Sequence, residues 1–348
     1  MKTVTFLLVL LISCNFALGQ DFNTMTGAEI CSQKKANSQN TINIFGDSPN
    51  TPRHSYDVLK YTLNLDLYNC FKTPGNSTFS GNDIINFRVD STLNSIQLNA
   101  VYASLVIDSV RLLNGAVLNF THNSTTNILT VTLDRTYNPT EVVTIKIYYR
   151  HNNVNNAFYS TSGGYVYTDC EPEGARRWFP CWDKPSDKAL TDITIKVPSN
   201  VIIGSNGRMN DSTVSADSIW YHWISRDPVS TYLVVLTGKT GYTFDIVWWH
   251  KLSNPNDSIP IRLYYAPGEN ITPTKNAIAD MTTFYSQIFG EHPFEKNGFA
   301  SVSGYGGGME NQTLTTIYPT GWSSVAALIS HEYGHQWFGE SPKIFIVF

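Results

Sequence analysis

The stretch Val325–Gly339, which reads VAALISHEYGHQWFG, decides how the rest of the chain is interpreted. It contains His331, Glu332 and His335 in the pattern H-E-x-x-H. Residues four apart on an α-helix lie one turn apart on the same face, so two imidazoles at this spacing can bind one zinc ion. The carboxylate between them points to the edge of that face, where a metal-bound water would lie. The alternative is a helix that carries two histidines by chance.

The residues on either side of this pattern favour a helix. Ser323 or Ser324 is expected to cap its N-terminus, and the apolar run at 325–329 is expected to be buried. Gly339 and Pro342 are expected to end it.

Composition places the chain among β-rich exported proteins. Its 348 residues suffice for about two domains. The aromatic share is high at 13% and the charged share low at 15%, which is typical of strand-rich chains. The net charge is -4 and no basic cluster occurs, so nucleic acid is not expected as a partner.

The N-terminus has the features of a signal peptide at residues 1–19. Lys2 precedes an apolar core, and Ala17-Leu18-Gly19 forms a small-x-small cleavage site. We therefore expect export, to the periplasm or outside the cell, with a flexible polar leader at 20–53. Leu11-Ile12-Ser13-Cys14 leaves open a lipoprotein anchored through Cys14. No transmembrane segment is expected in the mature chain, because no apolar run there approaches about 20 residues.

Four cysteines remain after the signal peptide. An even number in an exported chain makes one or two disulfides possible, and the sequence does not choose among the pairings. They are Cys31, Cys70, Cys170 and Cys181. Cys170 and Cys181 flank one loop-like segment and are a candidate pair.

Short alternating runs separated by turn residues predict an antiparallel β domain of sandwich or saddle shape at 54–247. Strands are expected at 56–67, 95–98, 105–113, 128–133, 142–149, 192–197, 219–224 and 232–236. The pattern then changes: a strand at 261–265, a helix at 272–288, strands at 299–302 and 313–318, and the helix of His331 follow. Residues 248–348 therefore resemble the first half of a thermolysin-like α+β zinc peptidase domain, and the chain as a whole is β-rich α+β.

One face of the helix at 272–288 is expected to be buried. Its apolar residues are Ala277, Ile278, Met281, Phe284, Tyr285 and Ile288.

Two further stretches carry chemistry. The first runs from Tyr305 to Asn311, where three successive glycines precede Met309 and Glu310. Glycines allow close approach of a backbone to a ligand, although a flexible hairpin tip is the simpler interpretation. The second is the charged and aromatic segment 168–185, which would otherwise be a domain-interface loop held by ion pairs.

Three motifs in this order and spacing resemble the aminopeptidase N family of zinc exopeptidases. Residues 307–311, GGMEN, resemble the family's G-A-M-E-N, with Gly308 in place of the alanine. Residues 331–339, HEYGHQWFG, resemble its H-E-x-x-H-Q-W-F-G, and 171–185 resemble its E-x-x-x-A-R-x-x-F-P-C-x-D-x-P. The likeness covers roughly 55–339.

The resemblance implies a zinc metallo-aminopeptidase, a hydrolase that removes N-terminal residues from peptides. His331 and His335 would bind one Zn²⁺ ion, and Glu332 would be the general base that activates a zinc-bound water. Glu332 would then pass the proton to the leaving amine.

The resemblance also implies how the substrate binds. Glu310, helped by Glu171 from the β domain, would hold the free α-ammonium of a peptide. The remaining motif residues would line the bound peptide; they are Gly307, Gly308, Met309 and Asn311.

The chain departs from the family after Gly339. The family's third zinc ligand is a glutamate about eighteen residues beyond the second histidine, near position 354, whereas Phe348 is the last residue. Its transition-state tyrosine and helical domain lie farther on. We therefore expect a chain truncated inside the catalytic domain, which holds zinc poorly by itself.

Two alternatives remain open. The chain is an inactive fragment or a binding module that uses its β domain, or it is a thermolysin-like endopeptidase. Glu310 and Glu171 argue against the endopeptidase, because cleavage inside a peptide requires no ammonium anchor.

Overall fold

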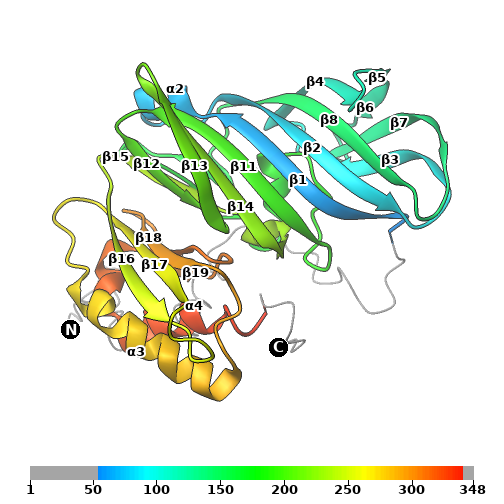
Figure 1. Ribbon diagram of the computed structural model, residues 1–348. Coiled ribbons are helices and arrows are strands. Elements are labelled where there is room, and N and C mark those ends of the chain that lie inside the picture. The colour runs from blue at the N-terminus through cyan, green and yellow to red at the C-terminus, as the bar shows by residue number, and fades with distance from the viewer. Residues whose placement is uncertain (1–53, 340–348) are drawn as a thin grey trace, which may run out of the picture.

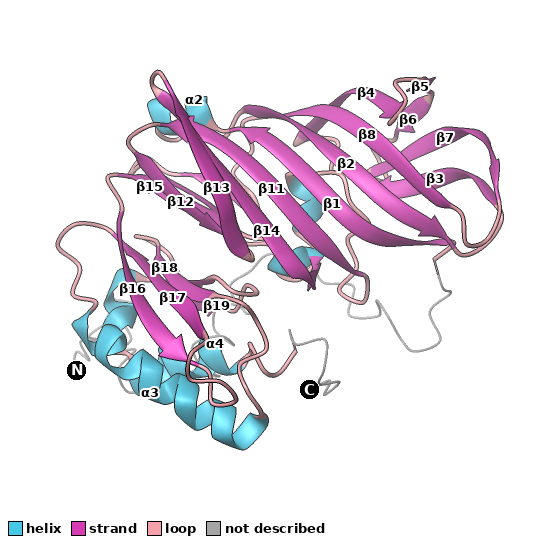
Figure 2. Ribbon diagram, in the orientation of Figure 1, coloured by secondary structure: helices cyan, strands magenta, loops and turns pink. Residues whose placement is uncertain are grey.

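The computed structural model describes residues 54–339. The predicted signal peptide, the leader, Cys14, Cys31, Pro342 and all other residues after Gly339 lie outside the described residues. Figure 1 shows a large strand-rich part at the top and a smaller part with helices below it. Figure 2 shows that most helical residues gather around the smaller part. The predicted β-rich α+β class is confirmed.

The largest sheet has eight strands. In spatial order they are β13 (Arg208–Ser215), β14 (Ser218–Ser230), β11 (Lys188–Pro198), β1 (Tyr56–Asp66), β2 (Phe79–Val89), β8 (Val142–His151), β4 (Leu105–Leu112) and β5 (Val117–Leu118). Alternation along β1 places Tyr61, Leu63 and Leu65 in the core and turns Asn64 and Asp66 to the outer face.

Two smaller sheets complete the β domain. One contains β12 (Val201–Ser205), β15 (Leu236–Thr240), β10 (Tyr165–Thr168) and β9 (Phe158–Ser160). The other contains β3 (Leu93–Asn99), β7 (Ile128–Tyr137) and β6 (Phe120–His122). Short helices α2 (Tyr68–Lys72), η2 (Ala175–Arg177) and η3 (Thr231–Leu233) lie between strands. The inner faces of the three sheets share one hydrophobic core.

The prediction that this domain is antiparallel throughout is wrong at its centre. Strands β1 and β11 pair in parallel, from Lys60 opposite Leu190 to Asp66 opposite Lys196. A parallel pair needs a crossover connection, and residues 67–187 between the two strands supply it while forming most of the other strands. Local alternation does not contain this information.

Residues 232–236 do not form the predicted strand. Residues 231–233 form η3, and β15 begins only at Leu236. The backbone of this segment bonds to a side chain instead of a neighbouring strand: Asn206 Nδ2 donates to Leu233 O at 2.9 Å, and Val235 N donates to Asn206 Oδ1 at 2.7 Å. The apolar run therefore marked burial and not a strand.

The second part of the chain is built on a five-stranded mixed sheet. Its strands in order are β16 (Thr243–His250), β17 (Ser258–Tyr265), β18 (Asn297–Ser301), β20 (Thr315–Ile317) and β19 (Gly308–Met309). The sheet begins at Thr243, a few residues before the predicted boundary at 247/248. Its helices are α3 (Thr272–Phe289), η4 (Pro319–Ser323), the π-helical turn η5 (Val325–Ile329) and α4 (Ser330–Gly334). No helix within 54–339 is long and apolar enough to cross a membrane.

Helix α3 has the predicted length, but its buried face is partly different. Thr274, Ile278 and Thr282, spaced four apart, point to the core, whereas Phe284 and Ile288 are 57% and 55% exposed. Each buried threonine has a hydrogen-bond acceptor, because Thr274 Oγ1 donates to Trp322 O at 2.6 Å and Thr282 Oγ1 donates to Ile278 O at 2.6 Å. Ile278 is buried as predicted, and Met281 and Tyr285 pack against the core, so the prediction is wrong for Phe284 and Ile288. Satisfied hydroxyl groups can be buried at little cost, and hydrophobicity alone therefore did not identify the threonines of the buried face.

The three cysteines in the described part of the chain are free thiols. Cys70, Cys170 and Cys181 are buried and form no disulfide, so the proposed Cys170–Cys181 link is wrong. Trp178 Nε1 lies 3.1 Å from Cys170 Sγ. Burial raises the pKa of Cys70 to about 12, which keeps it in the unreactive thiol form.

Asp83 is a buried carboxyl in the middle of the large sheet. It lies on the core face of β2, between the buried residues Leu63 on β1 and Ile147 on β8. Neither carboxyl oxygen has a hydrogen-bond partner within residues 54–339. Burial raises the pKa of Asp83 well above its usual range, because the charged form has lost its hydration.

We predict that Asp83→Asn stabilises the protein at high pH. The folded protein keeps a proton on Asp83 that the unfolded chain releases above about pH 4, so wild-type stability falls as pH rises from there to the folded-state pKa. Each unit of that pKa difference is worth about 1.4 kcal/mol. Urea unfolding at pH 4 and pH 8 should show the variant's gain only at pH 8. Asp108→Asn, a solvent-exposed control, should show no such gain, and an Asp83→Asn protein less stable than wild type at pH 8 would contradict the argument.

Candidate functional site

Helix α4 carries the H-E-x-x-H residues and is fixed from several sides. It continues directly from the π-helical turn η5, where the Ser324 carbonyl accepts from Leu328 N at 2.9 Å and Ile329 N at 3.1 Å. The predicted side-chain cap by Ser323 or Ser324 is wrong, since neither forms one. Helix α4 ends at Gly334 and His335 follows it as the C-cap, so the prediction that the helix extends to Gly339 is wrong. Gly339 has a φ of +98°, in the left-handed region, and lies beyond the end of α4.

Aromatic side chains attach α4 to the rest of its domain. Tyr333 OH lies 2.8 Å from Thr282 Oγ1 on α3, and Trp337 Nε1 donates to Gly290 O at 2.7 Å. Both rings are buried and contact each other edge to face at 5.3 Å. The apolar face of this segment thus fixes the direction of its polar face.

His331 lies on α4 and His335 is its C-cap residue, and the two side chains lie side by side. Their ring centroids are 5.0 Å apart at an interplanar angle of 88°, and both side chains are partly exposed. Two imidazoles one turn apart are suitable donors for zinc. Within residues 54–339, however, no group of three or more His, Cys, Asp or Glu side chains is placed to hold a metal, whereas catalytic zinc sites use three protein ligands. Zinc binding by His331 and His335 therefore stays a prediction, and a third ligand is not placed beside them within residues 54–339.

Glu332 is fully buried and lies against the glycine-rich strand β19. A Cβ atom at Gly308 would overlap with its carboxyl group, at 2.5 Å from Cδ and 2.6 Å from Cγ. The absence of a side chain at Gly308 therefore gives the Glu332 carboxyl its space. Gly307, with a φ of +95°, needs glycine for a different reason, because other residues rarely adopt this conformation.

Gln336 joins the helix to the segment of Glu310. Its Oε1 accepts from Thr313 N at 2.8 Å and its Nε2 donates to Glu310 O at 3.2 Å. The Gln336 side chain is buried, so both groups depend on these partners. Glu310, partly exposed, follows β19 and is held at a fixed position relative to α4.

The β domain holds the next residues of the same loop. Asn206 Nδ2 donates to Gln312 O at 2.7 Å, and the buried Lys296 Nζ donates to Ser205 O at 2.8 Å and Thr313 O at 2.9 Å. Burial and the neighbouring charge of Arg262 lower the pKa of Lys296 well below its usual range. Two of these bonds, from Asn206 to Gln312 and from Lys296 to Ser205, join the β domain to the part of the chain that contains the smaller sheet.

Tyr305 connects the glycine-rich stretch to the segment of Glu171. Its hydroxyl donates to Asp169 Oδ2 at 3.1 Å, and its ring contacts Tyr167 edge to face at 5.8 Å. Burial and then the charge of Asp169, with a smaller contribution from Glu332, raise the pKa of the Tyr305 hydroxyl well above its usual range. Glu171, two residues after Asp169, is partly exposed and precedes a cis peptide bond to Pro172. The structure thus brings the segment of Glu171 beside the residues that lead to Glu310.

Other charged residues of the segment 168–185 form ion pairs within the segment and stabilise its conformation. Arg176 Nε donates to the buried Asp183 Oδ2 at 2.9 Å, and Glu173 bonds to Arg176 at 2.6 Å and Lys184 at 2.8 Å. Thr231 Oγ1 donates to Asp183 Oδ1 at 2.7 Å. This network agrees with the interpretation of the segment as an interface loop held by ion pairs.

Two residues assigned to substrate binding have buried side chains. Met309 packs in the hydrophobic core, and Asn311 Nδ2 donates to Thr316 Oγ1 at 3.4 Å. Substrate contact through these two residues stays a prediction.

Sequence reasoning gave no role to Tyr305, Gln336, Asn206 or Lys296. Tyr305 and Gln336 lie inside quoted motifs, which was the available signal. No sequence signal marked Asn206 or Lys296, because the residues that they bond to are distant in the chain.

Comparison with known proteins finds relatives among aminopeptidases. "Aminopeptidase 2" of Candida albicans is 26% identical over 297 residues, which is 76% of this chain and 30% of that protein. "Glutamyl aminopeptidase" of Bos taurus is 32% identical over 190 residues, 49% of this chain and 19% of that protein. The chain thus spans less than a third of the length of these curated relatives.

Solved structures share the fold. The crystal structure of an M1 zinc metallopeptidase from Deinococcus radiodurans superposes with a TM-score of 0.72 at 24% identity, covering 82% of this chain and 65% of that one. A mutant of the same Deinococcus enzyme was solved with a Tyr-Ser-Ala substrate. The family described as "Peptidase M1 N-terminal domain" matches residues 53–233, more than half of the 348 residues. The chain therefore belongs to the M1 peptidase family.

Proposed function

We propose that this chain carries part of the active site of a zinc-dependent aminopeptidase. One observation carries the proposal: the carboxyl of Glu332, between two neighbouring imidazoles, packs against Gly308 of the strand that leads to Glu310. The carboxyl of Glu332, which is suited to proton transfer, thus lies beside the strand that leads to Glu310, whose carboxyl is suited to binding an ammonium group. The names of the relatives and the Deinococcus structures support the same activity.

His331 and His335 would hold the zinc ion, with a third ligand from outside residues 54–339. Bound zinc supplies Lewis acidity, which lowers the pKa of water and polarises a carbonyl. Glu332 would take a proton from the attacking water and transfer it to the leaving amine. Its buried position excludes bulk water, which strengthens its electrostatic effect on the reaction.

Glu310, with Glu171, would bind the substrate's free α-ammonium and so place the first peptide bond over the metal. The substrates would be peptides with a free N-terminus. We further propose export of the protein, through the signal peptide predicted at residues 1–19, with lipid anchoring through Cys14 as the less favoured form.

We predict that Glu332→Gln abolishes the release of N-terminal residues from amino-acid anilides. Glutamine keeps the size of the side chain but cannot accept the proton, so kcat should fall on the order of 10²- to 10⁴-fold. The measurement compares wild type with Glu332→Gln in a form of the protein that holds zinc, both supplied with zinc. Glu141→Gln, on the surface of the β domain, is the matched control. Unchanged turnover by Glu332→Gln would exclude the proposed role of Glu332.

We predict that Glu310→Gln raises KM for peptides with a free N-terminus by about 10- to 100-fold, because a charge-assisted contact to the ammonium is lost. Glu171→Gln should have the same direction of effect. Glu173→Gln is the control, since Glu173 already binds Arg176 and Lys184. N-acetylated peptides should not be cleaved by any of these proteins; their efficient cleavage would favour an endopeptidase.

We predict that Gln336→Leu both destabilises the fold and raises KM. Two backbone groups, the buried Thr313 N and the partly buried Glu310 O, lose their partner, which costs about 1–3 kcal/mol of unfolding free energy. Gln336→Glu keeps the acceptor for Thr313 N and should show an intermediate effect. Urea unfolding and steady-state kinetics check the two effects. A Gln336→Leu variant with wild-type stability would show that the two hydrogen bonds do not hold the site.

A further inference from the structure

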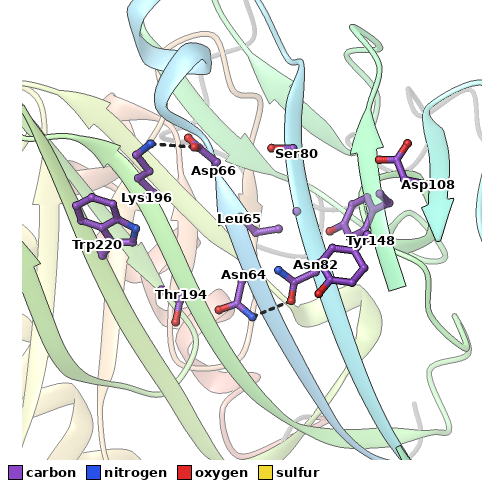
Figure 3. A pocket seen from close by; sticks show the side chains of 12 residues that line it. Asn64, Leu65, Asp66, Ser80, Asn82, Asp108, Tyr148, Thr194, Lys196 and Trp220 are labelled. Atoms are coloured by element: carbon purple, nitrogen blue, oxygen red, sulfur yellow. Dashed lines mark hydrogen bonds and ion pairs between the residues drawn. The ribbon is translucent and has the colours of Figure 1, made fainter. Parts of the chain in front are cut away.

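A cavity of about 380 Å³ lies on the outer face of the eight-stranded sheet (Figure 3). Its lining residues come from six neighbouring strands and include Asn64, Asn82, Tyr148, Thr194, Lys196 and Trp220. The proposed active-site residues lie elsewhere, on or next to helix α4 and on β19 of the five-stranded sheet. The cavity is therefore separate from the proposed active site.

Strand register aligns the polar side chains in a row. Thr194 lies opposite Asn64, Asn64 opposite Asn82, and Asn82 opposite Tyr148. Neighbouring strands are about 4.8 Å apart, so the row from Thr194 to Asn82 is about 10 Å long. That length suits one or two six-membered rings laid across the strands.

The charged groups in the cavity neutralise one another. Lys196 Nζ lies 2.9 Å from Asp66 Oδ2, and Asp108 binds Arg150 at 2.7 Å. A charged ligand would have to break one of these pairs, so the cavity fits an uncharged ligand.

The neutral polar groups, in contrast, remain available. Asn64 Nδ2 donates to Asn82 Oδ1 at 3.2 Å, which leaves the amide oxygen of Asn64 and the amide nitrogen of Asn82. Within 54–339 these two groups, and the hydroxyls of Ser80 and Thr194, have no side-chain or backbone partner. The cavity thus offers both donors and acceptors, as a ligand rich in hydroxyl groups requires.

Aromatic rings lie on two sides of the cavity: Tyr148 ends the polar row opposite Asn82, whereas Trp220 lies opposite Lys196 in the neighbouring row. Figure 3 shows Trp220 on one side and Tyr148 on the other, with Asn64 and Asn82 between them. Lys196 Nζ lies 5.7 Å from the Trp220 ring and Lys146 Nζ 4.8 Å from the Tyr148 ring. These contacts help to fix the rings, whose apolar surfaces remain partly exposed.

We propose that this cavity binds a neutral saccharide. The C–H faces of a sugar ring pack against aromatic side chains, while its hydroxyls bond to amide and hydroxyl groups such as those of Asn64, Asn82 and Thr194. A peptide fits less well, because a sheet face, unlike a sheet edge, offers no backbone hydrogen bonds. The site is independent of zinc and of peptidase activity.

The test titrates the 348-residue chain with linear tetrasaccharide glycosides of glucose, galactose, mannose and N-acetylglucosamine, followed by calorimetry and saturation-transfer NMR. Single sugars are too short, because three strand spacings of about 4.8 Å separate Trp220 from Asn82. At least one glycoside should bind with a Kd on the order of 1 mM, typical of a small polar ligand. Trp220→Ala and Asn82→Ala should each weaken binding at least tenfold.

Two variants serve as matched controls. Trp248→Ala removes a 52% exposed tryptophan on β16, and Asn86→Ala removes an asparagine of β2 that is bonded to Thr144 at 2.8 Å, outside the cavity. Both should bind as wild type does, and thermal melting should show that all variants fold. The proposal is overturned if no glycoside binds or if Trp220→Ala binds normally. Sedimentation that shows a dimer dissociated by Trp220→Ala would assign this face to a second copy and overturn it equally.

Discussion

The candidate site depends on two hydrogen bonds made by the side-chain amide of Gln336. It accepts a hydrogen bond from the buried Thr313 N and donates one to Glu310 O, which is partly buried. The side-chain amide does both at once with two different atoms, whereas an ionised carboxylate can only accept. Helix α4 and the loop of Glu310 are therefore held together as one unit. The contact between Gly308 and the Glu332 carboxyl lies within this unit and needs the same alignment.

The unit is in turn attached to the β domain by buried polar groups. Lys296 and Asn206 bind backbone carbonyls across the boundary, and Lys296 Nζ also lies 5.1 Å from the ring of Trp223. Burying an ammonium is costly unless it is hydrogen-bonded, so only a narrow range of domain positions satisfies it. That constraint places Tyr305 against Asp169 and the segment of Glu171 beside the path to Glu310. The outer face of the large sheet does not attach the two parts of the chain to each other. Its row of polar side chains can therefore bind a ligand.

Local patterns were sufficient for much of the fold. Alternation reports directly which side of a strand is buried, and it predicted β1, β3, β4, β7, β8, β11 and β14. It missed β2, although β2 is central, because Asp83 and Gly81 occupy core-facing positions and interrupt the apolar alternation. The bounds of α3 followed from a proline in its first turn and from helical spacing, but its buried face followed only in part, since two threonines are buried there.

The sequence by itself determined the helix with His331 and His335, the motif that contains Glu310, and most strands, because each of these depends on residues within a few positions of one another. Only the tertiary structure decided the parallel pairing of β1 with β11, the free thiols, and the partners of Tyr305 and Asn206. Tyr305 bonds to a residue 136 positions away and Asn206 to one 106 positions away. Such contacts are set by how whole sheets pack. A short stretch of sequence does not specify which distant residues will pack against it.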